Sequence, residues 1–328
     1  MTVYNRVYTQ EKWDRVNKYN KNLLQDYINQ AKAEGKSEAT LKQYLNNARI
    51  VMIYVLEELD NKPMYKLTRK HFRNFVLYLQ NNGLSTARIN SLLTISRNLL
   101  NFGLSDEEFE EDFEDMKLRP DRIKGIAKEL RREIIFLTDE EIHLICEGFA
   151  EKKKYQQALF IALAYDSCSR RNELYQIKRS DISLDSNICA SKVRGKRGKI
   201  YRPMYNDLTK KYFALLEEHR TDDTDYLWTT RSNGEVVEAS YETLYNWGLQ
   251  ARKIFAEKTG VYKEFNIHSI RHSTSTNLKD GTHYMCKKTG GALDLTIIQK
   301  LMNHSSIETT MSYIKQNDEE ELLGVFSL

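Results

Sequence analysis

Apolar residues recur at intervals of three and four between residues 11 and 105, a spacing that places them on one face of an α-helix. Four such stripes begin at Leu23, Leu41, Phe72 and Ile89. Ser37 and Ser85 stand just before the second and fourth stripes, where a serine side chain can cap a helix. We therefore expect residues 11–116 to form a compact all-helical domain.

The second half of the chain mixes helical stripes with two short β-like runs. The runs Asn187–Val193 and Lys199–Met204 flank a glycine-containing turn, which predicts an antiparallel hairpin. Helices are expected over residues 139–150, 155–166, 206–219, 240–258, 268–279, 294–302 and 306–316. The predicted fold class is mainly α: a helical N-terminal domain, then an α+β domain over residues 136–316 with a small antiparallel sheet.

The segment between these domains, residues 117–135, has a different composition and is predicted to be a basic linker. It carries seven basic residues against three acidic ones. The basic residues are Lys117, Arg119, Arg122, Lys124, Lys128, Arg131 and Arg132. Residues 1–10 and 317–328 are expected to be terminal tails, and a length of 328 residues fits two domains.

Composition narrows the class of protein. No apolar run reaches the roughly 18 residues of a membrane span, and the N-terminus lacks the apolar core of a signal peptide. The four cysteines lie far apart with no CxxC pair, which argues against a disulfide framework or a four-cysteine zinc module. We expect a cytoplasmic protein without a metal or other cofactor.

Charge is unevenly distributed along the chain. The net charge is +4, but the acidic run DEEFEEDFED (residues 106–115) hides a more basic remainder. Residues 187–202 carry six basic residues and no acidic one, more than solvation of a hairpin requires. We expect the acidic run to be an exposed segment that keeps the linker off the wrong surface.

Four groups of residues could carry chemistry. They are Arg170 with Glu173, the hairpin lysines Lys196 and Lys199, the cluster His268, Arg271 and His272, and His304 followed by Tyr313. The spacing of the first and third groups puts their members on shared helix faces, and Ser305 with Glu308 suggests a capping box before Tyr313. Singly, each group is explained by surface ion pairs or packing.

Together, the four groups resemble the tyrosine recombinase (phage integrase) family, with the two-domain layout of Xer and Cre recombinases. The matching segments are SCSRRNELYQIKRSDI, VRGKRGKIYRPM, HSIRHSTSTNLKDG and MNHSSIETTMSYIK, in the family's order. The front half is similar to the family's helical core-binding domain, so the resemblance spans residues 18–316. Asn303 replaces the usual glycine before His304, and Cys168 and Ser169 replace the usual Gly-Leu before Arg170.

The resemblance implies site-specific recombination of double-stranded DNA through a 3′-phosphotyrosine and a Holliday junction, without metal or ATP. Tyr313 would be the nucleophile, with Arg170 and Arg271 on the phosphate oxygens. His268 would accept the tyrosine proton, and His304 would hydrogen-bond the phosphate. Lys196 would protonate the leaving 5′ oxygen, with Lys199 as the alternative. Glu173 and His272 would not react themselves but would orient these groups.

The resemblance also implies DNA contacts and assembly. DNA-binding residues are expected in the hairpin and linker: Lys192, Arg194, Arg197, Lys199, Arg202, Lys117, Arg119, Arg122 and Lys124. The apolar C-terminal tail is expected to dock on a neighbouring protomer, linking four protomers on two DNA sites. No arm-binding domain of the kind some phage integrases carry precedes residue 11, so arm-assisted integration is not expected.

Several alternatives remain open. The long interval from Arg271 to His304, with its surplus in an expected loop around residues 281–294, favours a mobile-element integrase over a Xer-like enzyme that resolves DNA dimers. A non-catalytic architectural DNA-binding protein would also be basic, and type IB topoisomerases use similar chemistry. A zinc site could use His268, His272, His283 and Cys286, because helical histidines four apart can bind zinc, but it leaves Tyr313 and both arginines unexplained.

Overall fold

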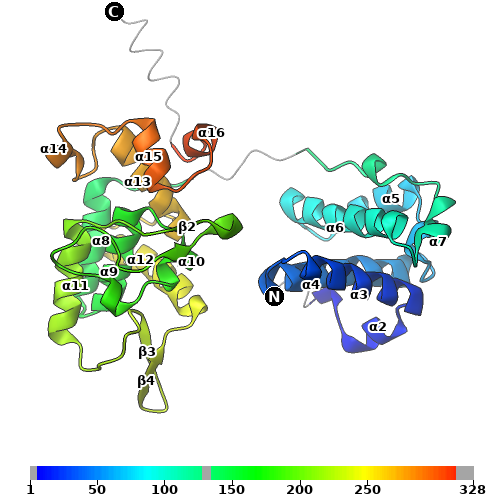
Figure 1. Cartoon of the computed structure of the whole chain (residues 1–328), viewed down its shortest axis with the longest axis horizontal. Coiled ribbons are helices and arrows are strands. Elements are labelled where there is room, and N and C mark those ends of the chain that lie inside the picture. The colour runs from blue at the N-terminus through cyan, green and yellow to red at the C-terminus, as the bar shows by residue number, and fades with distance from the viewer. Residues whose placement is uncertain (1–5, 128–133, 315–328) are drawn as a thin grey trace, which may run out of the picture. The chain divides into compact units, whose positions relative to one another are not determined.

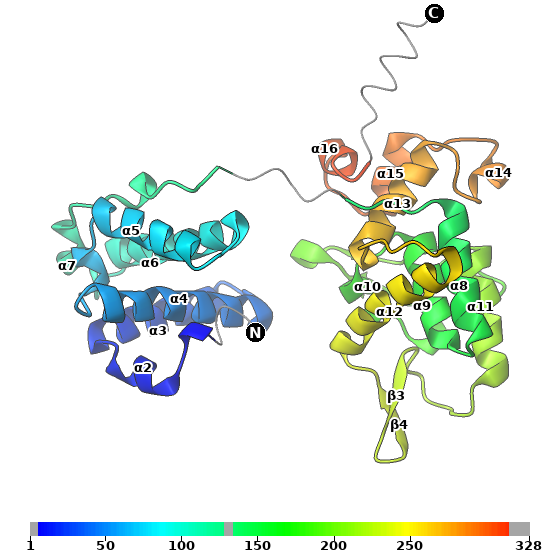
Figure 2. The ribbon, with the colours of Figure 1, turned by 180° about the vertical axis from the view of Figure 1, so that it is seen from behind.

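The computed structural model describes residues 6–127 and 134–314, which form two compact units. The boundary between the units lies between Arg131 and Arg132, inside the segment predicted as the linker. Figures 1 and 2 show the elements of each unit from opposite sides. Both units are mainly helical, which confirms the predicted fold class.

The N-terminal unit is built from helices alone in its described part. These are α2 (Gln10–Arg15), α3 (Lys18–Ala33), α4 (Glu38–Glu58), α5 (Arg69–Asn81), α6 (Thr86–Ser105) and α7 (Glu110–Glu114), with 3₁₀ turns at Met64–Lys66 and Pro120–Arg122. The Ser37 and Ser85 side chains accept hydrogen bonds from the backbone at the starts of α4 and α6, as predicted. The four predicted stripes meet in one core, with Leu23, Leu92 and Leu99 fully buried.

The acidic run is anchored, contrary to the expectation of a simple exposed segment. It forms α7, whose carboxylates face outward while Phe109 and Phe113 are buried in the core of the N-terminal unit. The Phe113 ring lies against Gly103 of α6 so closely that a Cβ there would come within 2.5 Å of it. The two aromatic residues among the acids therefore fix this segment in place.

The first part of the predicted linker, like the acidic run, packs on the N-terminal unit. Leu118 and Ile123 are buried among the helices. Asn90 of α6 donates to the Ile126 carbonyl (3.0 Å) and accepts from the Ile126 amide (2.8 Å). Arg97 donates to the carbonyl of Ile123 (2.8 Å). The apolar residues between the charges secure the chain to α6, and residues 128–133 lie outside the described part.

The C-terminal unit surrounds one buried helix. Its helices are α8 (Asp139–Glu151), α9 (Tyr155–Ser167), α10 (Arg171–Tyr175), α11 (Asp207–His219), α12 (Tyr241–Thr259), α13 (Ile267–Lys279), α14 (Cys286–Thr289), α15 (Leu295–Leu301) and α16 (Ile307–Met311). Helix α9 is buried from Ala158 to Ser167 and is packed by α8, α11 and α13 (Figure 1). A helix that is apolar on all sides is expected at the centre of a domain.

Two antiparallel hairpins complete this unit. Strands β1 (Val193–Arg194) and β2 (Ile200–Tyr201) pair at the centre of the predicted hairpin. Strands β3 (Thr229–Ser232) and β4 (Glu235–Glu238) form a second hairpin that the sequence analysis did not predict. Its signal is the Asn233-Gly234 dipeptide, whose two positive φ angles fit the tight turn that joins such strands.

Two predicted boundaries near the C-terminus are wrong. Helix α16 ends at Met311, so Tyr313 lies just beyond it and not two turns along it. Its cap is Ser306, which accepts from the Thr309 amide, and not Ser305. The expected loop at residues 281–294 contains the short helix α14, which ends in a left-handed Gly290.

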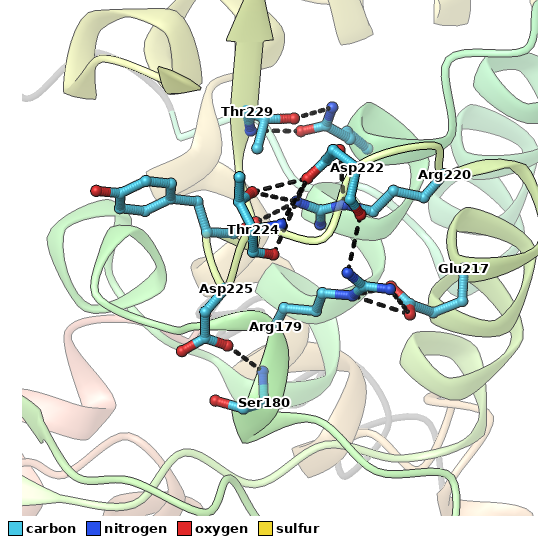
Figure 3. A network of polar contacts seen from close by, with 10 residues as sticks. Arg179, Ser180, Glu217, Arg220, Asp222, Thr224, Asp225 and Thr229 are labelled. Atoms are coloured by element: carbon cyan, nitrogen blue, oxygen red, sulfur yellow. Dashed lines mark hydrogen bonds and ion pairs between the residues drawn. The ribbon is translucent and has the colours of Figure 1, made fainter. Parts of the chain in front are cut away.

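A polar network holds the chain that leads into β3 (Figure 3). Arg179 binds the Glu217 carboxylate through Nε and Nη2 at 3.0 and 2.7 Å. Arg220 binds Asp222 in the same two-pronged way, and its hydrogen bond is the main reason that the pKa of Asp222 is lowered to about 2. Paired guanidinium–carboxylate contacts of this geometry fix the loop on α11.

In the described parts of the chain, no helix is both long enough and apolar enough to span a membrane.

Candidate active site

The first arginine of the site is held by a carboxylate behind it. Arg170 directly precedes α10, and its Nη1 lies 3.0 Å from Oε1 of the buried Glu173. The other Glu173 oxygen accepts from the Arg170 amide and from the Tyr201 hydroxyl, at 2.6 and 2.9 Å. A buried carboxylate with three donors fixes the guanidinium in one direction, so Glu173 and Tyr201 position Arg170.

The second arginine is almost fully enclosed. Arg271, on α13, is 1% exposed and donates to the carbonyl oxygens of Cys168 and Met302, the latter at 2.7 Å. Its Nε is buried without a hydrogen-bond partner in the described part of the chain. A buried cation needs compensation by oxygen acceptors. The unpaired N–H is therefore a natural place for an oxygen of a bound anion.

His304 lies directly beside Arg271. Its Nε2 accepts from Arg271 Nη2 at 2.9 Å, so the proton sits on Nδ1, which donates to the Thr310 hydroxyl at 3.1 Å. Burial and the positive charges of Arg271, Arg170 and Lys199 lower the pKa of His304 to about 3. The imidazole is therefore neutral at pH 7, and its Nε2 becomes available to another group only when Arg271 turns to a different acceptor.

Two further histidines surround Tyr313. The His272 ring stacks on the tyrosine ring at 4.2 Å and an angle of 16°, and its Nδ1 donates to the Tyr313 carbonyl at 2.9 Å. The His268 ring, on the exposed edge of the site, lies 5.2 Å from the tyrosine ring. Loss of solvent, then the charges of His272, Arg271 and Arg170, lower the pKa of His268 to about 4.

Tyr313 is thus brought to the predicted arginines and histidines although α16 is short. The ring is 4.8 Å from that of His304, and the Arg271 guanidinium is 5.4 Å from its centre. One edge of the ring packs on a small apolar cluster that includes Leu278, Ile298 and Met302. Five of the six predicted catalytic residues, Arg170, His268, Arg271, His304 and Tyr313, therefore meet at one place.

The sixth predicted catalytic residue, Lys196, is on the hairpin but is not at the centre of this site. It is exposed in the 3₁₀ turn Lys196–Gly198 between β1 and β2. Lys199 is closer, because its Nζ lies 3.4 Å from the carbonyl oxygen of Asn303 and its charge acts on His304. Both lysines remain candidates, because Lys196 begins the turn between β1 and β2 and Lys199 directly follows it.

The two departures from the family pattern share one backbone feature. Cys168 and Asn303 have φ angles of +53° and +51°, in the left-handed region that glycine adopts most easily. They precede Ser169-Arg170 and His304 respectively. Asparagine tolerates this region better than most residues, whereas cysteine does not share that preference. The chain therefore has the backbone path into Arg170 and His304 without the glycines.

The predicted DNA-binding residues are on the surface of both units. Lys192, Arg194 and Arg202 of the hairpin and Lys117, Arg119, Arg122 and Lys124 of the linker are exposed. The Arg197 side chain lies outside the described part of the structure. Sequence analysis missed three partners of the linker residues: Arg69, Lys70 and Arg73 of α5 join Arg122 and Lys124 around a 510 Å³ hollow with no acidic lining residue. Their signal was the basic spacing at the start of α5.

The zinc candidates do not converge as a group. His268 and His272 flank Tyr313, whereas His283 stacks on Tyr165 at 4.3 Å between centroids. In the described residues, no three or more histidine, cysteine or acidic side chains are placed to hold a metal ion together.

Comparisons with known proteins agree with the site's composition. The phage integrase family model matches residues 135–320, more than half of the chain. The SPbeta prophage-derived recombinase-like protein YomM of Bacillus subtilis (strain 168) is 26% identical over 325 residues, covering 95% of this chain and 92% of that protein. The tyrosine recombinase XerA of Thermococcus onnurineus (strain NA1) is 27% identical over 296 residues, covering 89% and 90%.

Two solved structures share the fold. The Tn1549 transposon integrase, in complex with transposon right end DNA, has a TM-score of 0.67 at 15% identity and covers 92% of this chain and 99% of its own. A lambda integrase dimer bound to a COC′ core site has a TM-score of 0.64 at 16% identity, covering 89% and 94%. The arrangement of helices around the site is therefore that of known integrases.

Proposed function

Since the chain belongs to the phage integrase family of tyrosine recombinases, we propose that it cuts and rejoins double-stranded DNA at specific sites through a 3′-phosphotyrosine and a Holliday junction. The observation that carries the proposal is the position of Tyr313 against Arg271, His268 and His304. A packing tyrosine would need none of these polar neighbours. A nucleophile aimed at a phosphate needs cations and a proton acceptor beside it.

In the proposed cleavage step, the Tyr313 hydroxyl oxygen forms a bond to the scissile phosphorus as the bond from phosphorus to the 5′ oxygen breaks. Arg170 and Arg271 bind the non-bridging oxygens, because a guanidinium offers two parallel donors and stays charged. The bond energy is kept in the protein–DNA link. The step therefore needs neither ATP nor a metal, and rejoining is its reversal.

Proton transfer sets the remaining roles. A phenol ionises near pH 10 in water, so its proton must leave as the bond forms. His268 is neutral at pH 7, since its pKa is about 4, and can accept that proton. Such a weak base favours transfer that is concerted with attack on phosphorus. His304 can donate to the phosphate once Arg271 turns to a phosphate oxygen and the imidazole proton is carried on Nε2, with Nδ1 then accepting from the Thr310 hydroxyl.

The leaving 5′ oxygen must gain a proton, and we assign this role to Lys196, following the family's Gly-Lys pattern. Its exposed turn has to fold over the DNA to do so. Lys199 is the second candidate, since it already contacts the Asn303 carbonyl beside His304.

DNA contacts are proposed for the basic residues of both units. The exposed hairpin and linker cations, with Arg69, Lys70 and Arg73 around the hollow on the N-terminal unit, would neutralise phosphates. Each neutralised phosphate releases counterions, so binding should weaken steeply as salt rises. Equal affinity at low and physiological salt would contradict this interface.

We further propose that the enzyme integrates or excises a mobile element. The prophage-derived relative, which matches along 95% of this chain, supports this role. The XerA relatives keep dimer resolution open as the alternative. Integration distinguishes the two roles, because it joins two separate DNA molecules, whereas excision and dimer resolution each divide one.

Tetramer assembly through the tail, residues 317–328, is also part of the proposal, and these residues lie outside the described part. Truncation after Lys315 should leave DNA binding intact and abolish cooperative assembly on paired sites. Unchanged cooperativity in a gel-shift titration would remove the tail from the proposal.

The function can be tested by recombination. A plasmid carrying two copies of the DNA that flanks the gene is incubated with wild type or with Tyr313→Phe, and new junctions are amplified and sequenced. We expect junctions from wild type only. If a library of genomic fragments gives none either, while wild type still binds DNA, the architectural alternative is favoured.

A further inference from the structure

A hollow extends from the catalytic residues along α12, and the proposed cleavage of one phosphate does not account for it. Its volume is 260 Å³. Arg170, His268 and Arg271 line it together with Arg171 and Tyr245, and Ile267 and Leu249 supply an apolar wall. None of its lining residues is acidic. An electropositive hollow with an apolar wall suits a segment of nucleic acid strand.

Arg171 is held in an unusual way for a surface arginine. Its guanidinium lies 4.0 Å from the centre of the Tyr241 ring and 5.0 Å from that of Tyr245, both on the first turns of α12. No described carboxylate pairs with it, and its Nη1 is buried without a hydrogen-bond partner. The rings thus keep the planar group in place while leaving its donors available to an acceptor.

Adjacent phosphates of a DNA strand are spaced so that neighbouring arginines can each take one. We propose that Arg171, held by Tyr241 and Tyr245, binds the phosphate next to the scissile phosphate on the cleaved strand, and that the hollow receives the sugar between the two. Arg171 is then a positioning residue, because it fixes the strand while Arg170 and Arg271 bind the reacting phosphate.

The proposal accounts for two features at once. A strand held at two successive phosphates cannot rotate about the reacting one, which is what in-line attack by Tyr313 requires. The exposed tyrosines, 39% and 42% accessible, are explained as the support of the arginine and not as stray apolar surface. The inference rests on the proposed function for the identity of the reacting phosphate, but the DNA contact itself can be tested separately.

The first test needs no knowledge of the target site. The affinity for a fluorescent random-sequence duplex of about 30 base pairs is measured from low to physiological salt for wild type, Arg171→Gln and Arg171→Lys. We expect Arg171→Gln to bind roughly tenfold more weakly at low salt and to lower the salt slope by about 0.9. Arg171→Lys should keep the slope, because it keeps the charge, and lose part of the affinity.

The control removes a charge elsewhere. Lys211→Gln takes one positive charge from α11, which Figures 1 and 2 show on the side of the unit opposite α10. An equal loss of slope in Lys211→Gln and Arg171→Gln would mean a bulk charge effect and overturn the proposal. So would an Arg171→Gln variant with a lower melting temperature and an unchanged slope, since that marks a purely structural stack.

The second test uses DNA on which the covalent link to Tyr313 has been mapped. Phosphates around the cut are replaced one at a time by uncharged methylphosphonates. Replacement of the phosphate next to the scissile one should lower the affinity of wild type for this DNA. The affinity of Arg171→Gln should not change. If the replacement lowers the affinity of wild type and of Arg171→Gln equally, Arg171 does not bind that phosphate and the proposal is overturned. If no covalent link forms on any DNA, the proposed function fails, while the salt slopes still decide the role of Arg171.

Discussion

At the scale of single residues, the site depends on backbone geometry as much as on its charged groups. Asn303 and Cys168 stand at the left-handed positions from which the chain turns toward His304 and Arg170. The Asn303 carbonyl also accepts from Lys199. The backbone conformation of Cys168 and Asn303 therefore sets the direction of the chain that carries Arg170 and His304.

Asn303 offers a direct test of this geometry. Asn303→Gly should change the free energy of unfolding by less than about 1 kcal/mol, because glycine adopts the same φ without strain. Asn303→Val should lower the free energy of unfolding by at least about 1–2 kcal/mol, because a β-branched side chain is strained in the left-handed region. Denaturant unfolding measures both. If the valine variant is as stable as the glycine variant, φ at this position does not constrain the fold.

The two hairpin lysines can be separated by changing the leaving group. Lys196→Ala should slow cleavage of ordinary DNA by about 10²–10⁴-fold, the typical contribution of a general acid. A substrate whose 5′ oxygen at the cut is replaced by sulfur needs no such acid, since a thiolate leaves unprotonated, and it should restore the rate. Lys199→Ala should slow cleavage of ordinary DNA less than Lys196→Ala does. The sulfur-containing substrate should not restore its rate.

Two other outcomes of the sulfur-substitution experiment would change the assignment of the general acid. Rescue of Lys199→Ala alone would assign the acid to the lysine that contacts the Asn303 carbonyl. Rescue of neither variant would contradict a lysine general acid altogether.

The sequence predicted candidate catalytic residues that the structure brings together, but it did not predict the residues that support them. Arg170, His268, Arg271, His304 and Tyr313 could be proposed because they match the motifs of the phage integrase family in the family's order. Tyr201 could not, since its contact with Glu173 depends on a hairpin register that no local pattern specifies. The packing of Arg171 on α12 is equally a product of the folded state.

At the scale of elements, apolar periodicity predicted most helices, and errors arose where an element is short. Helix α16 has one and a half turns, too few for its period to mark its end. The acidic run was read by its charges, although Phe109 and Phe113 at a spacing of four already indicated a helix face. Longer helices such as α9 and α12 were predicted to within a residue or two at each end.

The anchoring of α7 can be tested at Gly103. Gly103→Ala should destabilise the protein by about 1–3 kcal/mol, because the added methyl group would overlap the Phe113 ring. Asn101→Ala, at an exposed position of the same helix, is the matched control and should stay within about 0.5 kcal/mol of wild type. Equal denaturation midpoints for the two variants would mean that α7 is not packed on α6.

At the scale of the whole molecule, the free energy of unfolding should depend on pH because His283 is buried in its neutral form. His283 is fully buried against Tyr165 and Tyr284. Burial, and to a lesser degree the charge of His143, lower its pKa from 6.5 to about 3. The unfolded chain therefore binds a proton as pH falls through 6.5, while the folded chain does not until about pH 3. Stability is full above pH 7 and falls below 6.5.

The expected size of this effect is roughly 2 kcal/mol between pH 7 and pH 5. His283→Gln cannot take up that proton, so its free energy of unfolding should fall less over the same range. The free energy of unfolding is measured against pH for wild type and for His283→Gln. Comparing the slopes of these two curves, and not the absolute stabilities, removes the effect of changed packing. Parallel slopes would show that His283 is protonated in the folded protein.

The central claim is that Tyr313 becomes covalently joined to DNA. Wild type, Tyr313→Phe and Tyr201→Phe are each incubated with labelled, nicked fragments from beside the gene and run on denaturing gels. We predict a protease-sensitive adduct from wild type and, more slowly, from Tyr201→Phe, with mass spectrometry placing the DNA on Tyr313. An adduct from Tyr313→Phe, or one mapped to another residue, would contradict the account.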